Sequence, residues 1–150
     1  MFLKKLFITA NSDGKGISDI ITLEEGNDIA RKARQIRRQI LKMQQAFTLI
    51  EQISYNSLSY SIHGVCFGAG VDLITACDIR HCTADATFSV KEVDIGLAAD
   101  VGSLNRLPKI CGNEGWLREV ALTARNFNAE EALKFGKYRS FNDDINIDKI

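Results

Sequence analysis

Three carboxylates and a glycine-rich turn are the parts of this sequence where chemistry could sit. The turn is Gly68-Ala69-Gly70, and Asp72 follows it in the first turn of an expected helix. Backbone N–H groups at such a turn can hold a phosphate, or the oxyanion of a thioester that is being converted to an enolate. The turn is not the dinucleotide-binding fingerprint, because the third glycine of that motif would fall at Leu73.

The other two carboxylates, Glu92 and Asp100, lie further along the chain. Glu92 follows an expected strand, and Asp100 ends the apolar stretch Ile95–Ala99. A carboxyl group in an apolar environment acquires a raised pKa, which suits general acid–base catalysis. The alternative interpretation is structural, with Asp72 as a helix N-cap, Glu92 as a surface acid and Asp100 as a helix cap. Spacing alone leaves both interpretations open.

The elements that position these residues follow from the hydrophobic pattern. Apolar side chains repeat at steps of three and four from about Asp28 to Ile53, which predicts one long amphipathic helix. Packing of this helix on a sheet is favoured over a coiled coil. The alternating segment 57–62 predicts a strand, which leads through the turn into a helix from Val71 to about Asp78. Strand, turn and helix form half of a βαβ unit.

The remaining elements are shorter. Strands are expected over 79–83 and 87–90, and a helix over 112–124. A last helix over 128–135 has Asn128 as its cap, with Glu131 three residues later, and it ends at Gly136. One domain over 1–136 is therefore expected, followed by a frayed tail over 137–150.

Composition narrows the functional class. The 150 residues include 19 basic and 19 acidic side chains, and 45% are hydrophobic, which is typical of a globular domain. The balanced charge gives no electrostatic case for binding nucleic acid, and no apolar run is long enough to span a bilayer. The four cysteines lack metal-ligand spacing, so buried free thiols and no metal site are expected.

The predicted long helix also carries a basic face without an acid among its members. This basic face consists of Arg31, Lys32, Arg34, Arg37, Arg38 and Lys42. It is either a solvated surface or a patch that meets the phosphates of a ligand, and the sequence does not separate the two.

Longer motifs connect the three acids to a known family. The sequence resembles the crotonase (enoyl-CoA hydratase/isomerase) superfamily over 62–73 and 76–80. Three further stretches are more specific and resemble its Δ3,5-Δ2,4-dienoyl-CoA isomerase branch, namely 90–102, 106–109 and 122–125. The match is close from about Asp19 to Gly136. It implies an α/β fold with a crotonase-like (ClpP/crotonase) βαβ core.

The resemblance also implies a reaction. In that branch three acids line the pocket, and they match Asp72, Glu92 and Asp100. Glu92 would take a proton from C2 of a 3,5-dienoyl-CoA, and Asp100 would give one to C6. Asp72 would orient groups or tune the pocket electrostatically. Ordinary hydratases are similar at the first two positions and not at the third, so Asp100 discriminates isomerase from hydratase.

The oxyanion of the intermediate would be held by two backbone N–H groups. One matches Ala69, where the family usually has glycine. The other falls within Ala10-Asn11-Ser12-Asp13-Gly14, most closely at Ser12, where the match requires a gap. No cofactor is implied, because coenzyme A is part of the acyl-CoA thioester substrate.

The ends of the chain depart from the family pattern. The family's first strands and its C-terminal helices have no counterpart, so the chain is expected to be truncated at both ends. Two alternatives therefore remain. One is enoyl-CoA hydratase, and the other is a non-catalytic remnant that binds acyl-CoA or pairs with full-length subunits. A complete family member would form a homo-oligomer, a trimer or hexamer, in peroxisomes or mitochondria, and no targeting signal is readable.

Overall fold

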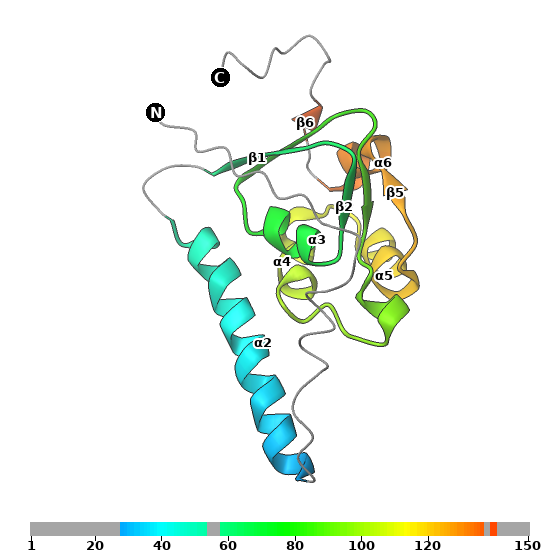
Figure 1. Ribbon diagram of the computed structural model, residues 1–150. Coiled ribbons are helices and arrows are strands. Elements are labelled where there is room, and N and C mark those ends of the chain that lie inside the picture. The colour runs from blue at the N-terminus through cyan, green and yellow to red at the C-terminus, as the bar shows by residue number, and fades with distance from the viewer. Residues whose placement is uncertain (1–27, 54–57, 137–138, 141–150) are drawn as a thin grey trace.

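Residues 28–53, 58–136 and 139–140 are described by the computed structural model of the chain (Figure 1). The expected second oxyanion segment, Ala10–Gly14, lies outside these residues. Within the expected tail over 137–150, Arg139 and Ser140 form a short strand, and the rest of the tail also lies outside them.

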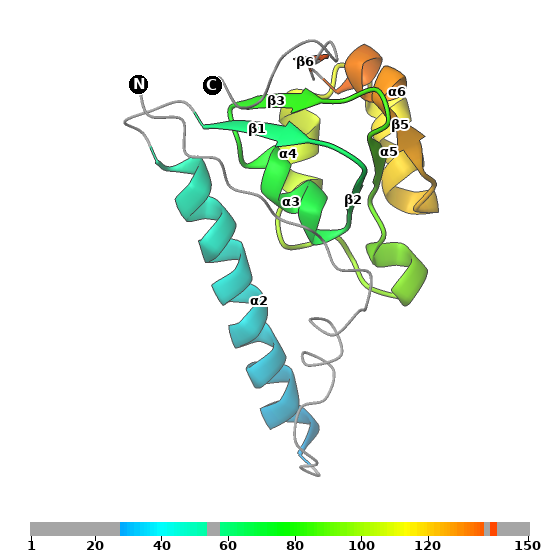
Figure 2. The ribbon, with the colours of Figure 1, turned by 45° about the horizontal axis from the view of Figure 1, so that its top comes forward.

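The long amphipathic helix is confirmed as α2, Ile29–Glu51. It begins where expected because the Asp28 carboxylate accepts hydrogen bonds from the backbone N–H groups of Ala30 (2.9 Å) and Arg31 (3.3 Å). None of its residues is fully buried. Figures 1 and 2 show that its N-terminal half extends away from the rest of the fold. Only its C-terminal part meets the core, through Phe47 and Ile50.

Within the described residues, six short strands form two three-stranded sheets. They are β1 Ser59–Ile62, β2 Val65–Phe67, β3 Ile79–Cys82, β4 Thr87–Ser89, β5 Phe127–Asn128 and β6 Arg139–Ser140. The sheet orders are β1-β3-β6 and β2-β4-β5, and every pair is parallel except β4 with β5. The chain passes from β1 to β2 through Gly64, which adopts a positive φ of 64°. Strands β1 and β3 pair in parallel, and α3 lies between them in the sequence. The three elements form a βαβ unit.

The helices that follow α2 in the sequence cover these sheets. After α2 they are α3 Ala69–Thr75, the 3₁₀ helix η1 Glu92–Ile95, α4 Ser103–Ile110, α5 Glu114–Thr123 and α6 Ala129–Phe135. The predictions of α5 and α6 are confirmed, including the Asn128 cap, whose side chain accepts from the Glu131 N–H (2.9 Å). Helix α3 begins two residues earlier than predicted. Strand β2, η1 and α4 are additions that the sequence pattern did not predict.

A hydrophobic core fixes α3 and β4 against α5. Phe88 on β4 is fully buried, and its ring stacks on Phe127 with the centroids 5.3 Å apart. Trp116 on α5 meets the same Phe127 ring edge-on at 5.1 Å. The four cysteines are free thiols as predicted, three of them buried and Cys111 half-buried. This packing gives rigid supports to the turn before α3 and to the end of β4.

Candidate active site

The glycine-rich turn lies against the Glu92 carboxyl group. Gly68 has a φ of 53°, a conformation that favours glycine, and a Cβ atom there would lie 3.3 Å from Glu92 Oε1. The Gly68 N–H donates to the Ser89 carbonyl (2.9 Å), which joins the turn to the end of β4. Ala69 is exposed, and its N–H donates no hydrogen bond to the described residues. That N–H is available to an oxyanion beside Glu92.

Glu92 is half-buried, and it forms no ion pair with any side chain in the part of the chain that the structure describes. Its Oε2 atom is buried and has no hydrogen-bond partner among the described residues. Burial raises the pKa of Glu92, and the negative charges of Asp72 and Asp100 raise it further. A carboxylate with a raised pKa is a stronger base once it is ionised, which suits proton abstraction.

Asp72 is the most deeply placed of the three acids, with 1% of its surface exposed. Its Oδ1 atom accepts hydrogen bonds from the Ser103 N–H (2.6 Å) and the Ser103 hydroxyl (2.7 Å). Burial raises the Asp72 pKa, while the Ser103 hydrogen bonds and the Arg106 charge partly offset that effect. Asp72 thus joins α3 to the start of α4, with its oxygen engaged by protein donors.

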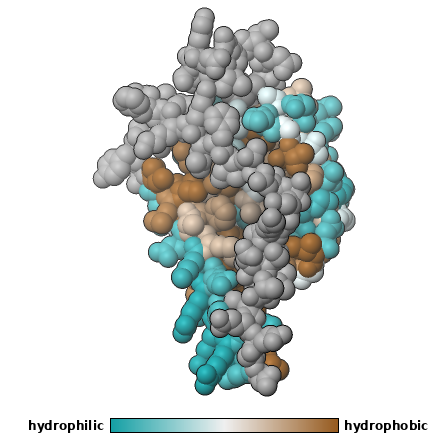
Figure 3. Space-filling view, viewed as in Figure 1, coloured by the Kyte–Doolittle hydropathy of each residue, from teal (hydrophilic) through white to brown (hydrophobic). Residues whose placement is uncertain are grey.

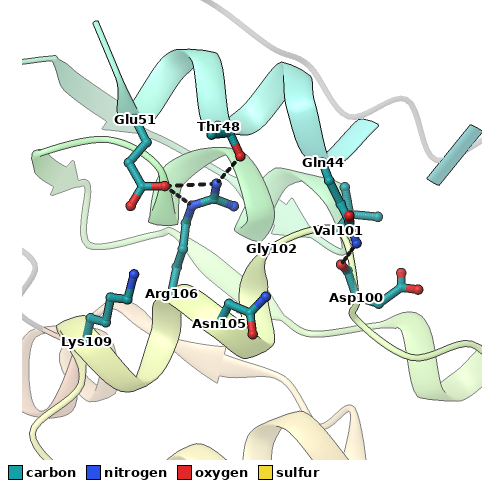
Figure 4. Close-up of a pocket in the computed structure, with 9 residues that line it drawn as sticks. All are labelled: Gln44, Thr48, Glu51, Asp100, Val101, Gly102, Asn105, Arg106 and Lys109. Atoms are coloured by element: carbon teal, nitrogen blue, oxygen red, sulfur yellow. Dashed lines mark hydrogen bonds and ion pairs between the residues drawn. The ribbon is translucent and has the colours of Figure 1, made fainter. Parts of the chain in front are cut away.

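Asp100 differs from the expectation of an apolar environment. The stretch before it forms η1 and a surface loop, in which Ile95 and Leu97 are exposed, and Asp100 is exposed as well. Figure 4 shows its carboxylate pointing away from Arg106 while its carbonyl accepts a hydrogen bond from the Gln44 amide (2.7 Å). Asp100 is held through its backbone, with its carboxylate available to a ligand.

Arg106 is a residue that the sequence pattern gave no reason to place at the site. Its guanidinium lies between α4 and α2, with Nε and Nη2 each 3.1 Å from Glu51 Oε2. Nη2 also lies 3.4 Å from the Thr48 hydroxyl (Figure 4). Its side chain is 8% exposed, whereas that of Glu51 is 43% exposed. Together with the Gln44 contact, this pair holds the last turns of α2 against the segment that carries Asp100.

The space between α2 and α4 forms a cavity of about 480 Å³. Asp100, Gly102, Arg106 and Lys109 line it from the α4 side (Figure 4). It is polar, and Asp100 lies at its border with a second groove along α2.

Gly102 supplies the space for the Arg106 guanidinium. A Cβ atom at this position would lie 1.9 Å from Arg106 Nη1. We therefore expect Gly102→Ala to lower the free energy of unfolding by about 1–3 kcal/mol, the usual cost of overpacking. Urea denaturation of the two chains measures this difference.

Gly112→Ala is the matched control, because a Cβ atom at Gly112 meets no atom within 4 Å. An equal loss of stability in both variants would show that the Arg106 contact is not the cause.

The basic face predicted on the long helix lies on the surface of α2. All six residues of the basic face are exposed, and Figure 3 shows hydrophilic side chains gathered along the N-terminal half of α2.

Across residues 28–53, 58–136 and 139–140, no cluster of His, Cys, Asp and Glu side chains is arranged to hold a metal ion. The helices in the same part of the chain are too short or too polar to cross a bilayer.

Comparison with known proteins points to one family. Residues 22–141 match the family model described as enoyl-CoA hydratase/isomerase. The chain is 49% identical over 132 residues to the mitochondrial Delta(3,5)-Delta(2,4)-dienoyl-CoA isomerase of Rattus norvegicus, covering 88% of this chain and 40% of that protein. It is 50% identical over 125 residues to the peroxisomal enzyme of the same name from Arabidopsis thaliana, covering 83% and 44%.

The solved structures agree. An enoyl-CoA hydratase from Thermoplasma volcanium matches with a TM-score of 0.71 and 26% identity, covering 85% of this chain and 48% of that chain. The present chain thus spans less than half the length of each of these relatives.

Proposed function

Because this chain belongs to the enoyl-CoA hydratase/isomerase family, we propose that it acts as a Δ3,5-Δ2,4-dienoyl-CoA isomerase in fatty-acid β-oxidation. The observation that supports this most is the Glu92 carboxyl group, which lies against the Gly68 turn and is partly buried. The pKa of Glu92 responds to both Asp72 and Asp100, so the three groups share one electrostatic environment. An isomerase needs two acid–base groups along an extended acyl chain, and in this proposal they are Glu92 and Asp100.

The chemical steps assign one role to each group. Ionised Glu92 takes a proton from C2 of the 3,5-dienoyl-CoA, and the electron pair moves onto the thioester oxygen. The Ala69 N–H, next to Glu92 through Gly68, donates to that oxygen. Asp100, which begins the cycle protonated, then gives a proton to C6 as the electrons return, which leaves the 2,4-dienoyl-CoA. Glu92 afterwards releases its proton to solvent and Asp100 takes one up, so both groups regain their starting states. One proton leaves the substrate and one enters it, so no redox step and no added water are required.

Asp72 and Arg106 act as positioning residues in this proposal. The Ser103 hydrogen bonds hold Asp72 in place, and its negative charge raises the pKa of Glu92. Arg106 and Gln44 hold the segment that carries Asp100 against α2. Ser12 as the second oxyanion donor lies outside the described residues and remains part of the proposal.

The direct test compares two reactions catalysed by the purified chain. We expect 3,5-octadienoyl-CoA to be converted to the conjugated 2,4-isomer, which absorbs in the ultraviolet, faster than 2-octenoyl-CoA is hydrated. Faster hydration would favour the enoyl-CoA hydratase alternative. If neither reaction exceeds its rate in buffer alone, the result contradicts the proposal and favours the non-catalytic alternative.

Compartment and assembly also remain proposals for this chain. Mitochondrial and peroxisomal relatives support one of those two compartments. Homo-oligomerisation is the corresponding expectation for assembly, and light scattering of the purified chain measures it.

A further inference from the structure

The basic face of α2 carries positive charge that the described part of the molecule does not neutralise. Elsewhere, Arg106, Arg118 and Arg125 each form an ion pair with a glutamate. On the basic face only Arg31 forms an ion pair among the described residues, with the Asp28 carboxylate at 3.1 Å. The other five cations of the face are exposed to solvent.

These cations also lie close enough to repel one another. Arg34 and Arg38 are four residues apart on α2, and so are Arg38 and Lys42. Like charges at this spacing destabilise an α-helix. From Ile29 to Ile50 no acidic side chain occurs that would offset the repulsion. An anionic surface along this face would offset it and would therefore stabilise α2.

The charges of the chain are segregated between α2 and the other residues. The basic face holds six of the 19 basic side chains, so the other residues carry 13 basic and 19 acidic side chains. The N-terminal half of α2 extends away from the rest of the fold and is covered by hydrophilic side chains (Figures 1 and 3). An anionic surface therefore attracts α2 and repels the remainder, which turns the basic face towards that surface.

We propose that the basic face of α2 docks on the surface of a membrane that contains anionic phospholipids. Its cations span residues 31–42, about 17 Å of helix, and occupy more than half of the circumference. A broad face of this kind suits a flat array of lipid phosphates, and four to eight basic residues on an amphipathic helix are typical of binding to anionic lipids. In this proposal α2 lies on the membrane without crossing it.

The position of the basic face argues against two other anionic partners. Ile36 and Ile40 line the groove along α2 that borders Asp100, and Arg38 lies about 160° around the helix from each of them. Phosphates of a ligand in the candidate active site are therefore on the wrong side of α2. A nucleic acid would meet the net negative charge of the other residues, and no aromatic side chain between Ile29 and Ala46 is available to stack on its bases.

Sedimentation of the full chain with lipid vesicles tests the proposal. One set of vesicles is phosphatidylcholine alone, and the other is two parts phosphatidylcholine to one part phosphatidylserine. We expect the mixed vesicles to bind the chain about tenfold more tightly or better, and we expect added salt to weaken that binding.

Arg34→Gln combined with Arg38→Gln removes two charges from the basic face and keeps a good helix former at both positions. A basic residue near an anionic surface contributes about fivefold in affinity, so this double variant should bind the mixed vesicles about 25-fold more weakly. Circular dichroism of the variant shows whether α2 is retained.

Arg118→Gln combined with Lys134→Gln is the matched control. Both residues are exposed, on α5 and α6, and their removal lowers the net charge by the same amount. We expect the control to bind the mixed vesicles as the unmodified chain does. An equal loss in both double variants would overturn the proposal, because binding would then follow net charge and not the basic face.

The other outcomes separate lipid from the remaining partners. Equal binding to the two kinds of vesicle, or binding to neither, would overturn the proposal. Free coenzyme A and a DNA duplex of random sequence are further probes. If the Arg34→Gln, Arg38→Gln variant loses more affinity for either of them than for the mixed vesicles, the face binds that partner and the proposal is wrong. Because no turnover is measured, failure of the proposed isomerase leaves this inference in place, and the reverse also holds.

Discussion

We expect Glu92→Gln to lower the rate of dienoyl-CoA isomerisation by about 10²- to 10⁴-fold, the range that general acid–base groups contribute. Glutamine has nearly the same shape as glutamate, so it preserves the contact with Gly68, but its amide cannot accept the C2 proton. The same substitution also removes exchange of the C2 hydrogen with deuterium from the solvent. The two measurements are the ultraviolet assay of isomerisation and mass spectrometry of acyl-CoA incubated in D₂O.

Glu130→Gln is the control for this substitution, because Glu130 is an exposed glutamate on α6. We expect its rate to equal that of the unmodified chain. Retention of C2 exchange by the Glu92→Gln variant would assign the base to another residue.

The pH profile adds an independent check on Glu92. The base must be ionised, and burial together with the negative charge of Asp72 raises its pKa. The rate is therefore expected to fall on the acid side at a higher pH than an ordinary glutamate would give. Asp72→Asn removes this charge and keeps an oxygen that can accept from Ser103. It should shift the acid limb to lower pH.

Local signals in the sequence predicted several elements well. Asn128 caps α6 as predicted, and α2 begins directly after Asp28, where the amphipathic run was predicted to start. The strands β3 and β4 lie within their predicted ranges. The crotonase-like α/β fold is confirmed by the family match and by the solved structures. Caps and periodicity depend on residues close in sequence, so the amino-acid order alone is sufficient to reveal them.

The missed elements lacked such signals. Helix α4 contains Pro108, a residue that usually interrupts helices, and it is only eight residues long. Strand β2 has three residues between two glycines, too few for a pattern of alternation. Both elements depend on packing in the folded chain, with β2 pairing to β4 and α4 lying beside α3.

The positioning contacts of the site were equally hidden. Ser103 reaches Asp72 across 31 residues, and Arg106 reaches Glu51 across 55. Gly102 is a sequence feature connected with these contacts, because the absence of a side chain there leaves space for Arg106. Asp100 shows the opposite error, because an apolar run in the sequence suggested burial where the chain forms a surface loop. The apolar residues that precede Asp100 in the sequence therefore did not predict its exposure in the structure.

We expect Asp100→Asn to lower isomerisation by about 10²-fold or more while exchange of the C2 hydrogen with solvent deuterium continues. Asparagine preserves the backbone carbonyl that Gln44 holds, so the segment keeps its place on α2. The asparagine amide cannot deliver a proton to C6, whereas Glu92 still removes the proton from C2. The substitution therefore separates the two proton transfers.

The comparison of the two variants decides the role of Asp100. Glu92→Gln is expected to lose both isomerisation and C2 exchange, and Asp100→Asn only the first. Because hydration of a 2-enoyl-CoA places no proton on C6, any hydratase activity of the chain should survive Asp100→Asn. Equal loss of both signals in the two variants would indicate that Asp100 supports the site as a whole. An unchanged isomerisation rate would remove it from the reaction, and with it the feature that distinguishes an isomerase from a hydratase here.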